Sequence, residues 1–305
     1  MTTRSTAGTV LGSPLWLATR ESAGRLAAIA SLSAREAFRS RSLVVALVLN
    51  LLYLGLLALI GYAIANAPGA QEAADLLGET GARFFLWFAL GGASALALFT
   101  GVFTSVGSIA TEIERGTILA VVARPIARWE IVIGKFLGNA LIAVAYLLVE
   151  GLAIAAAVGL LSGIWVTVVP LVLLLLSLNV VVMVAVAVAG STRLSTVANA
   201  ITVIVLYLAL TNTAILQLIG AIVDNEGLRL LADWSRYLLP VGPVSDLATE
   251  ILLGPAAAMV GGGGGGVPGR EVLLPMREWV WLYELGYLGL VIALGVWSFS
   301  RRDLR

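Results

Sequence analysis

Long uncharged apolar stretches, separated by short charged ones, dominate the chain. A helix rises 1.5 Å per residue, so about 20 apolar residues cross a hydrocarbon core of about 30 Å. The apolar run from Phe136 to Gly190 is too long for one span and divides most naturally at residues 161–163. The pattern therefore predicts an all-α polytopic membrane protein with six transmembrane helices. Their ranges are about 42–66, 83–110, 136–160, 165–190, 196–223 and 279–300.

Composition supports this placement in a membrane. Hydrophobic residues make up 60% of the 305 positions and charged residues 12%, against about 45–50% and about 25% in soluble domains. A net charge of +1 gives no support for binding nucleic acid. Without cysteine or histidine, the chain lacks thiolate nucleophiles, histidine acid–base catalysts and the usual metal and haem ligands. We therefore expect neither a catalytic residue nor a metal site.

Basic residues predict the orientation. Most of the 19 lysines and arginines fall in segments that lie on one side of a six-span arrangement with its N-terminus inside. The positive-inside rule then places both termini in the cytoplasm. Arg4, Arg20 and Arg25 interrupt the N-terminus before a signal-peptide core can form. Insertion is therefore expected to be directed by the first span, and residues 42–305 form the transmembrane domain.

The cytoplasmic N-terminal segment, residues 1–41, contains an expected amphipathic helix at about residues 15–40. Leu26, Ile29 and Ser33 recur at helical spacing, and arginines occupy the other face. Such a helix is predicted to lie in the inner headgroup layer with its arginines on anionic lipid. Packing on the helical bundle is the alternative.

The largest outer segment, residues 224–277, is expected to hold two short helices. Leu230, Trp234 and Leu238 recur at helical spacing before Pro240 ends that helix, and a second follows at about 244–253. The six glycines Gly261–Gly266 are interpreted as a flexible linker. A phosphate cradle is disfavoured because no Gly-Lys-Ser/Thr sequence and no helix follow.

Between the second and third spans lies a charged island, Thr111–Lys135. Its two helical ends are expected to flank a turn at Gly116–Thr117 and a short apolar run, Ile118–Val122, lying along the membrane face. Proline disfavours a helical conformation in Arg124 and ends that run. The result is a compact helix-turn-helix in the cytoplasm, although a loop that merely fixes topology would have the same composition. Its seven charged residues are Glu112, Glu114, Arg115, Arg124, Arg128, Glu130 and Lys135.

The sequence from Glu112 to Gly138 resembles the cytoplasmic signature of ABC-2-type transporter permeases. That signature has an acidic residue, Gly/Lys-Thr-Leu, a hydrophobic stretch, Arg-Pro-Ile-x-Arg and Gly-Lys-x-x-Gly. The branch that it resembles includes the permease of nitrous-oxide-reductase copper maturation and gliding-motility permeases. The matching positions are Glu112, Thr117, Arg124, Pro125, Ile126, Arg128, Gly134, Lys135 and Gly138.

The resemblance implies a type V exporter-like transmembrane domain whose island is a coupling helix docking on a cytoplasmic ATPase. No Walker A sequence is present, so the ATPase is expected to be a separate chain that binds ATP and Mg, and this chain is expected to bind no cofactor. Two ATPase copies, a second permease copy and the lipid of a bacterial inner membrane are the implied partners. A homodimer is favoured and a heterodimer is open, as is an extracytoplasmic partner protein. The implied ATPase-coupling residues are Glu112, Glu114, Arg115, Thr117, Arg124, Pro125, Arg128 and Lys135.

Polar residues inside the spans offer a second functional hypothesis. Glu150, Asn179 and Asn212 are candidates for an intramembrane polar site, because charged groups in hydrocarbon face protein or water. An ion-gradient-driven secondary transporter using Glu150 is the alternative to an ATP-driven permease that exports or transmits force. A hydrogen bond from Glu150 to a neighbouring helix is the structural alternative. No pattern in the sequence identifies the transported substrate.

Overall fold

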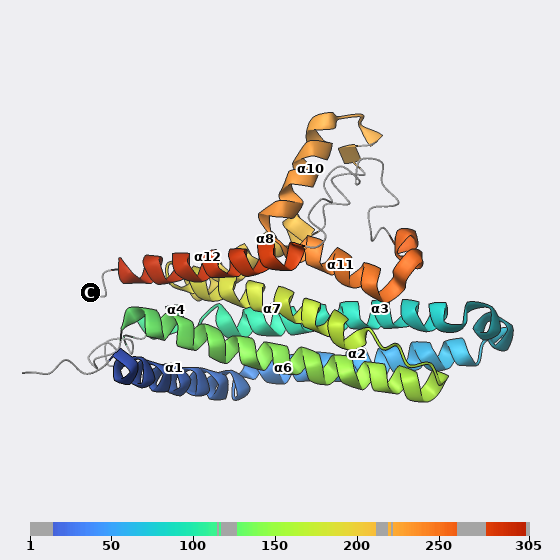
Figure 1. Ribbon diagram of the computed structural model, residues 1–305, viewed down its shortest axis with the longest axis horizontal. Helices are drawn as coiled ribbons and strands as arrows, with labels where there is room; N and C mark the ends of the chain where they lie inside the picture. The colour runs from blue at the N-terminus through green and yellow to red at the C-terminus, as the bar shows by residue number, and fades with distance from the viewer. Residues whose placement is uncertain are drawn as a thin grey trace, which may run out of the picture.

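A computed structural model describes residues 15–114, 116, 127–211, 219–220, 222–260 and 279–302, and the regular elements in these ranges are all helices (Figure 1). A 3-10 helix, η1 (Gly254–Val260), follows α11. The α-helices are α1 (Leu15–Phe38), α2 (Arg41–Ala65), α3 (Ala70–Ser105), α4 (Ala110–Glu114), α6 (Arg128–Ser162), α7 (Val169–Ser191), α8 (Thr196–Thr211), α10 (Glu226–Leu238), α11 (Val241–Leu253) and α12 (Val280–Ser300).

Five helices are long and apolar enough to cross a membrane, and they coincide with five of the six predicted spans. They are α2, the run from α3 to α4, α6, α7 and α12. The predicted division at residues 161–163 is confirmed, because α6 ends at Ser162 and the next residue, Gly163, has a φ of 71° that breaks the helix. The predicted fifth span begins with α8, which has 16 residues. Residues 212–218 lie outside the described ranges, so a sixth span stays a prediction.

The long helices lie side by side along one axis, with α7 at the centre (Figure 1). It packs against α3, α6, α8, α11 and α12, and Val182, Met183 and Val184 are fully buried. Gly101 of α3 allows this close packing, since a Cβ there would lie 2.8 Å from Val184 and 2.9 Å from Ala143 of α6. The core is therefore the seam where α3, α6 and α7 meet.

Both predicted helices of the outer segment are present. The side chain of Asn225 accepts a hydrogen bond from the Leu228 backbone N–H and begins α10, and Pro240 stands between α10 and α11. Arg83 of α3 donates to the Leu252 carbonyl at 2.8 Å and holds α11 against the bundle. Helix α10 stands away from the bundle (Figure 1). The predicted linker Gly261–Gly266 lies outside the described residues.

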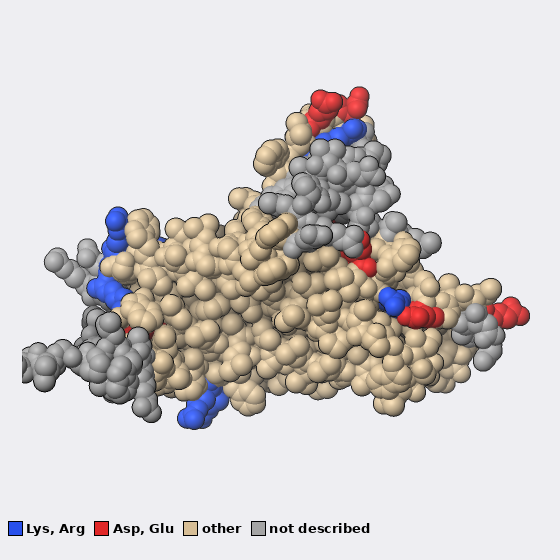
Figure 2. All heavy atoms as spheres, viewed as in Figure 1, with Lys and Arg blue, Asp and Glu red and all other residues tan. Residues whose placement is uncertain are grey.

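The exterior has the character expected of a membrane protein. Uncharged side chains form the middle of the visible face, and charged side chains gather mainly toward its ends and on the tip of α10 (Figure 2). Exposed tryptophans lie at both ends of the spanning helices, as in the aromatic belts of membrane proteins. They are Trp129 and Trp297 at one end, and Trp165, Trp279 and Trp281 at the other. We call the first of these the island end, because α4 and the start of α6 lie there.

Candidate functional site

The two described ends of the charged island lie at the same end of the bundle. The first is α4, which ends at Glu114, and the second is the start of α6 at Arg128. Gly116 has a φ of 70°, which agrees with the predicted turn at this position. Four predicted coupling residues lie outside the described part of the chain: Arg115, Thr117, Arg124 and Pro125.

Lys135, the only lysine in the chain, joins three helices at the base of the island. Its Nζ lies 2.6 Å from Glu112 Oε1 of α4 and 3.8 Å from Glu36 Oε2 of α1. The lysine side chain is 6% exposed, and a buried ammonium group is tolerated only when opposite charges accompany it. This cluster of one cation and two carboxylates therefore sets the position of α4 relative to α1 and α6.

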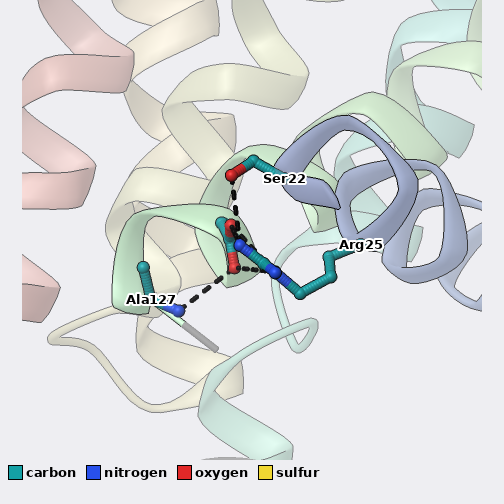
Figure 3. A network of polar contacts seen from close by, with 4 residues as sticks. Ser22, Arg25 and Ala127 are labelled. Carbon is teal, nitrogen blue, oxygen red and sulfur yellow. Dashed lines mark hydrogen bonds and ion pairs between the residues drawn. The ribbon is translucent and has the colours of Figure 1, made fainter. Parts of the chain in front are cut away.

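Glu130 forms a second ion pair, with Arg25 of α1 (Figure 3). Arg25 Nη2 donates to Glu130 Oε1 at 2.9 Å, and its Nε donates to both carboxylate oxygens at 3.1 and 3.2 Å. Oε2 also accepts the backbone N–H of Ala127 at 3.1 Å, a donor that the first turn of α6 leaves without a helical partner. The same side chain thus caps α6 and fixes α1 to it.

The charge of Glu130 is favoured by these contacts. Helix α6 has 35 residues, a length of about 50 Å, so its first turn lies beyond the predicted span 136–160. The hydrogen bond from Arg25 holds the pKa of the Glu130 carboxyl below its usual value, and the backbone N–H of Ala127 acts in the same direction. Burial opposes this shift but is outweighed. Glu130 is therefore ionised at neutral pH.

Two glycines of the resemblance, Gly134 and Gly138, let α1 approach α6 closely. A Cβ on Gly134 would lie 2.6 Å from the side chain of Ile29. A Cβ on Gly138 would collide with the Ala30 carbonyl and lie 2.7 Å from Ser33. The Gly-Lys-x-x-Gly sequence therefore faces α1 in the interior of the protein.

Arg128 binds the end of the last helix. Its Nη1 donates to the carbonyls of Ser300 and Arg302, each at 2.9 Å, where α12 leaves its final carbonyls without helical partners. From the end of α7, Arg193 donates to the Ser298 hydroxyl at 2.9 Å. The start of α6 and the ends of α7 and α12 are thereby joined at the island end.

The structure thus divides the four described coupling residues into two groups. Glu114 is exposed at the end of α4, where it is accessible to a partner. Glu112, Lys135 and Arg128 hold other helices in place. The sequence interpretation missed the pairing role of Arg25, although this arginine lies four residues before Ile29 on the otherwise apolar face of its helix.

The three candidates for an intramembrane polar site are not joined into one site. Asn179 of α7 donates to the Ser245 hydroxyl of α11 at 2.9 Å. Glu150 of α6 is 4% exposed, and no hydrogen bond joins it to Asn179 within the described ranges. Asn212 lies outside those ranges. A further carboxyl, Glu284 of α12, is fully buried.

Apolar helices long enough to cross a bilayer, joined at one end by buried ion pairs, define a multi-pass helical membrane protein. The chain belongs to a known transporter family: the model of the ABC-2 family transporter proteins matches residues 27–304. No curated protein matches the sequence. Membership indicates a permease of an ABC transporter and implies partnership with an ABC ATPase, and the family is generally a non-catalytic membrane subunit.

Proposed function

We propose that this protein is the permease subunit of an ABC transporter in which the charged island docks on a separate ATPase. The ATPase binds ATP and Mg, and its closure moves the island, which moves the spanning helices. The work performed is export, or force transmission to a partner outside the cytoplasm. In this proposal the island end faces the cytoplasm of a bacterial cell and the spans lie in its inner membrane.

The ion-paired base of the island carries this proposal. Lys135 ties α4 to α6 and α1, and Glu130 ties the start of α6 to α1. A displacement of the island therefore moves α1, α4 and α6 together, because separating these helices would leave buried charges without partners. A loop that merely fixed topology would need no such base.

The docking surface in this proposal consists of Glu114 and the segment beyond it, with Arg115, Thr117, Arg124 and Pro125. Mixed charges set the register against a partner, and apolar side chains between them supply buried contacts. Glu112, Arg128 and Lys135 act as positioning residues, since their charged groups are bound to other helices.

The functional assembly contains two permeases and two ATPases, with two copies of this chain as the favoured pair. ATP-driven closure switches the two permease halves between conformations. Within the family, we propose that this chain is related to the branch that includes the permeases of copper maturation and gliding motility. An ion-gradient mechanism through Glu150 alone is disfavoured, because it gives the island no role.

Copurification tests the docking. The tagged full-length chain is coexpressed with an ABC ATPase from the same genome, and the captured protein is assayed for ATP hydrolysis. Glu114→Arg is expected to reduce capture at least tenfold, because it reverses an exposed charge without touching the base. Glu226→Arg is the matched control, since Glu226 is exposed on α10 outside the island. Equal capture by both variants contradicts docking through Glu114.

The wild type tests the function itself. An ABC ATPase should copurify with it, and its ATP hydrolysis should change when the permease is added. Transport by the purified chain without any ATPase would instead support the ion-gradient alternative.

A further inference from the structure

A hydrogen bond links helices α2 and α6. They run in the same direction, and α2 begins after α1, part of the way along α6 (Figure 1). Tyr146 of α6 donates a hydrogen bond from its hydroxyl to the Ala46 carbonyl of α2 at 3.4 Å. Four residues further along each helix, about one turn, come Asn50 and Glu150. The register therefore places an amide opposite a carboxyl.

Both side chains are buried and incompletely bonded. Asn50 is 8% exposed and Glu150 is 4% exposed. Within the described ranges, neither carboxyl oxygen of Glu150 nor Nδ2 of Asn50 makes a hydrogen bond of normal geometry, although the Asn50 side chain lies next to the carboxyl. Asn50 lies nine residues into α2, about 14 Å from its start, so the pair lies deep in the predicted hydrocarbon core. Buried polar atoms of this kind are costly unless they are paired.

Among the described residues, no ion pair compensates Glu150. Apart from Arg83 at the edge of the second predicted span, residues 42–66, 84–110, 136–160 and 165–190 contain no lysine or arginine, and Glu150 is the only charged residue among them. The other titratable groups near the carboxyl are the phenols of Tyr53 and Tyr146, and the buried carboxyl on α12 is Glu284. An ionised Glu150 would therefore be an isolated charge in a medium that solvates it poorly.

Protonation of Glu150 removes this isolated charge. A carboxylic acid has one O–H donor and one carbonyl acceptor, and a primary amide has the complementary acceptor and donors. With small side-chain rotations, the acid O–H donates to the Asn50 oxygen and Nδ2 donates back to the acid carbonyl. All three unpaired atoms are then bonded. An ionised carboxylate has no donor and forms only half of this pair.

We propose that Glu150 is a proton-binding site whose neutral acid pairs with Asn50 and holds α2 to α6. Loss of the proton breaks one of the two bonds and leaves a charge that draws in water, so α2 separates from α6. Movement of α2 that admits water releases the proton in turn. This coupling between a proton and helix position goes beyond ATPase docking and does not depend on it.

Infrared spectroscopy of the purified full-length chain in lipid nanodiscs at pH 7 tests the proton. Glu150→Gln should remove acid-carbonyl absorption equivalent to one side chain and leave the carboxylate absorption unchanged. Glu130→Gln is the matched control, because Glu130 is ionised beside Arg25, and it should remove only carboxylate absorption. Loss of carboxylate absorption in Glu150→Gln would overturn the proposal.

A second pair of variants tests the partner. Asn50→Leu should shift the Glu150 acid-carbonyl band to higher frequency, because the carbonyl loses its hydrogen bond. Asn179→Leu should leave that band in place, since Asn179 is bonded to Ser245 elsewhere in the bundle. An unshifted band in Asn50→Leu refutes the pairing.

The wild type alone provides a third test, which no folding defect of a variant can obscure. A membrane-soluble carbodiimide adds to a protonated carboxyl: the carboxyl oxygen bonds to the central carbon and the acid proton moves to nitrogen. The resulting O-acylisourea rearranges to a stable N-acylurea without loss of atoms. Mass spectrometry should find this adduct on Glu150 at pH 7, and its absence contradicts the proposal.

Discussion

Arg25 and Glu130 lie 105 positions apart in the sequence and form a bidentate ion pair with a shortest N–O distance of 2.9 Å. The pair joins the N-terminal helix α1 to the first turn of α6, where the charged island ends. The carboxylate is 1% exposed and the arginine is 37% exposed. One side chain therefore links the island to a helix that precedes all the spanning helices.

Arg25→Ala should destabilise the protein by about 2 kcal/mol. Removing one partner of a buried pair costs about 3–5 kcal/mol, and the partial exposure of Arg25 reduces this value. Thermal unfolding in lipid nanodiscs measures the loss. Arg35→Ala is the control, since Arg35 is exposed on the same helix, and it should change stability by less than about 0.5 kcal/mol. Equal effects of the two variants would mean that the pair does not hold α1.

The stability that Glu130 contributes should depend on pH with a definite sign. Its folded pKa is lowered, so the contribution is complete above the unfolded pKa of about 4.3 and is lost as the pH falls through the lower folded value. The stability difference between wild type and Glu130→Gln should be constant from pH 8 to pH 6. It should narrow below about pH 4.3. A difference that grows on acidification would contradict the ionised state of Glu130.

The sequence predicted the helices well because their signals are local. The first span was expected at Ser42–Asn66 and α2 is Arg41–Ala65, since an uncharged apolar run and its flanking polar residues determine where such a helix ends. The break at residues 161–163 and the stop at Pro240 follow from local backbone preferences.

The contacts of the candidate site depend on how helices pack, and no local pattern specifies that. Nothing near Glu112 in the sequence indicates that Lys135 is its partner, or that Glu36 lies 3.8 Å from the same ammonium. Nor does any local pattern indicate that Lys135 is buried. The family resemblance located the site but did not separate docking residues from positioning residues.

Lys135 and Glu112 should show strong coupling in a double-mutant cycle. Lys135→Met leaves a buried carboxylate without its nearest cation, and Glu112→Gln leaves the ammonium with Glu36 at 3.8 Å. The stability loss of the double variant should be smaller than the sum of the losses of the two single variants, by about 1–3 kcal/mol. Chemical or thermal unfolding of the four proteins in nanodiscs gives the coupling energy.

The more exposed pair Glu79–Arg83 on α3 is the control for this cycle, which separates the interaction of the pair from the hydrogen bond of Arg83 to Leu252. Its atoms lie 2.6 Å apart, and the glutamate is 58% exposed. Solvent screening limits the coupling of such a pair to about 0.5 kcal/mol. Similar coupling energies in the two cycles would show that burial of Lys135 does not strengthen its pairing.

Gly138→Ala should push α1 away from α6. The added methyl would overlap the Ala30 carbonyl and lie 2.7 Å from Ser33, and backbone atoms cannot move aside as a flexible side chain can. Overpacking of this kind costs about 1–3 kcal/mol. Gly91→Ala is the control, because nothing lies within 4 Å of a Cβ there, and it should be neutral or slightly stabilising. Unchanged thermal stability in Gly138→Ala would refute the close approach of α1.

Arg128→Ala should loosen the end of α12 and separate positioning from docking. Arg128 donates to the carbonyls of Ser300 and Arg302, and loss of a cation and its hydrogen bonds at a helix C-terminus costs about 1–2 kcal/mol. Amide hydrogen exchange of residues 299–302 should therefore accelerate about tenfold, while residues 280–283 at the other end of α12 keep their rates.

Arg128→Ala should still capture the ATPase, because in the wild type the Arg128 side chain binds α12 and not the partner. ATP hydrolysis, however, should no longer respond to the permease as it does in the wild type. Loss of capture with unchanged hydrogen exchange would instead place Arg128 on the docking surface.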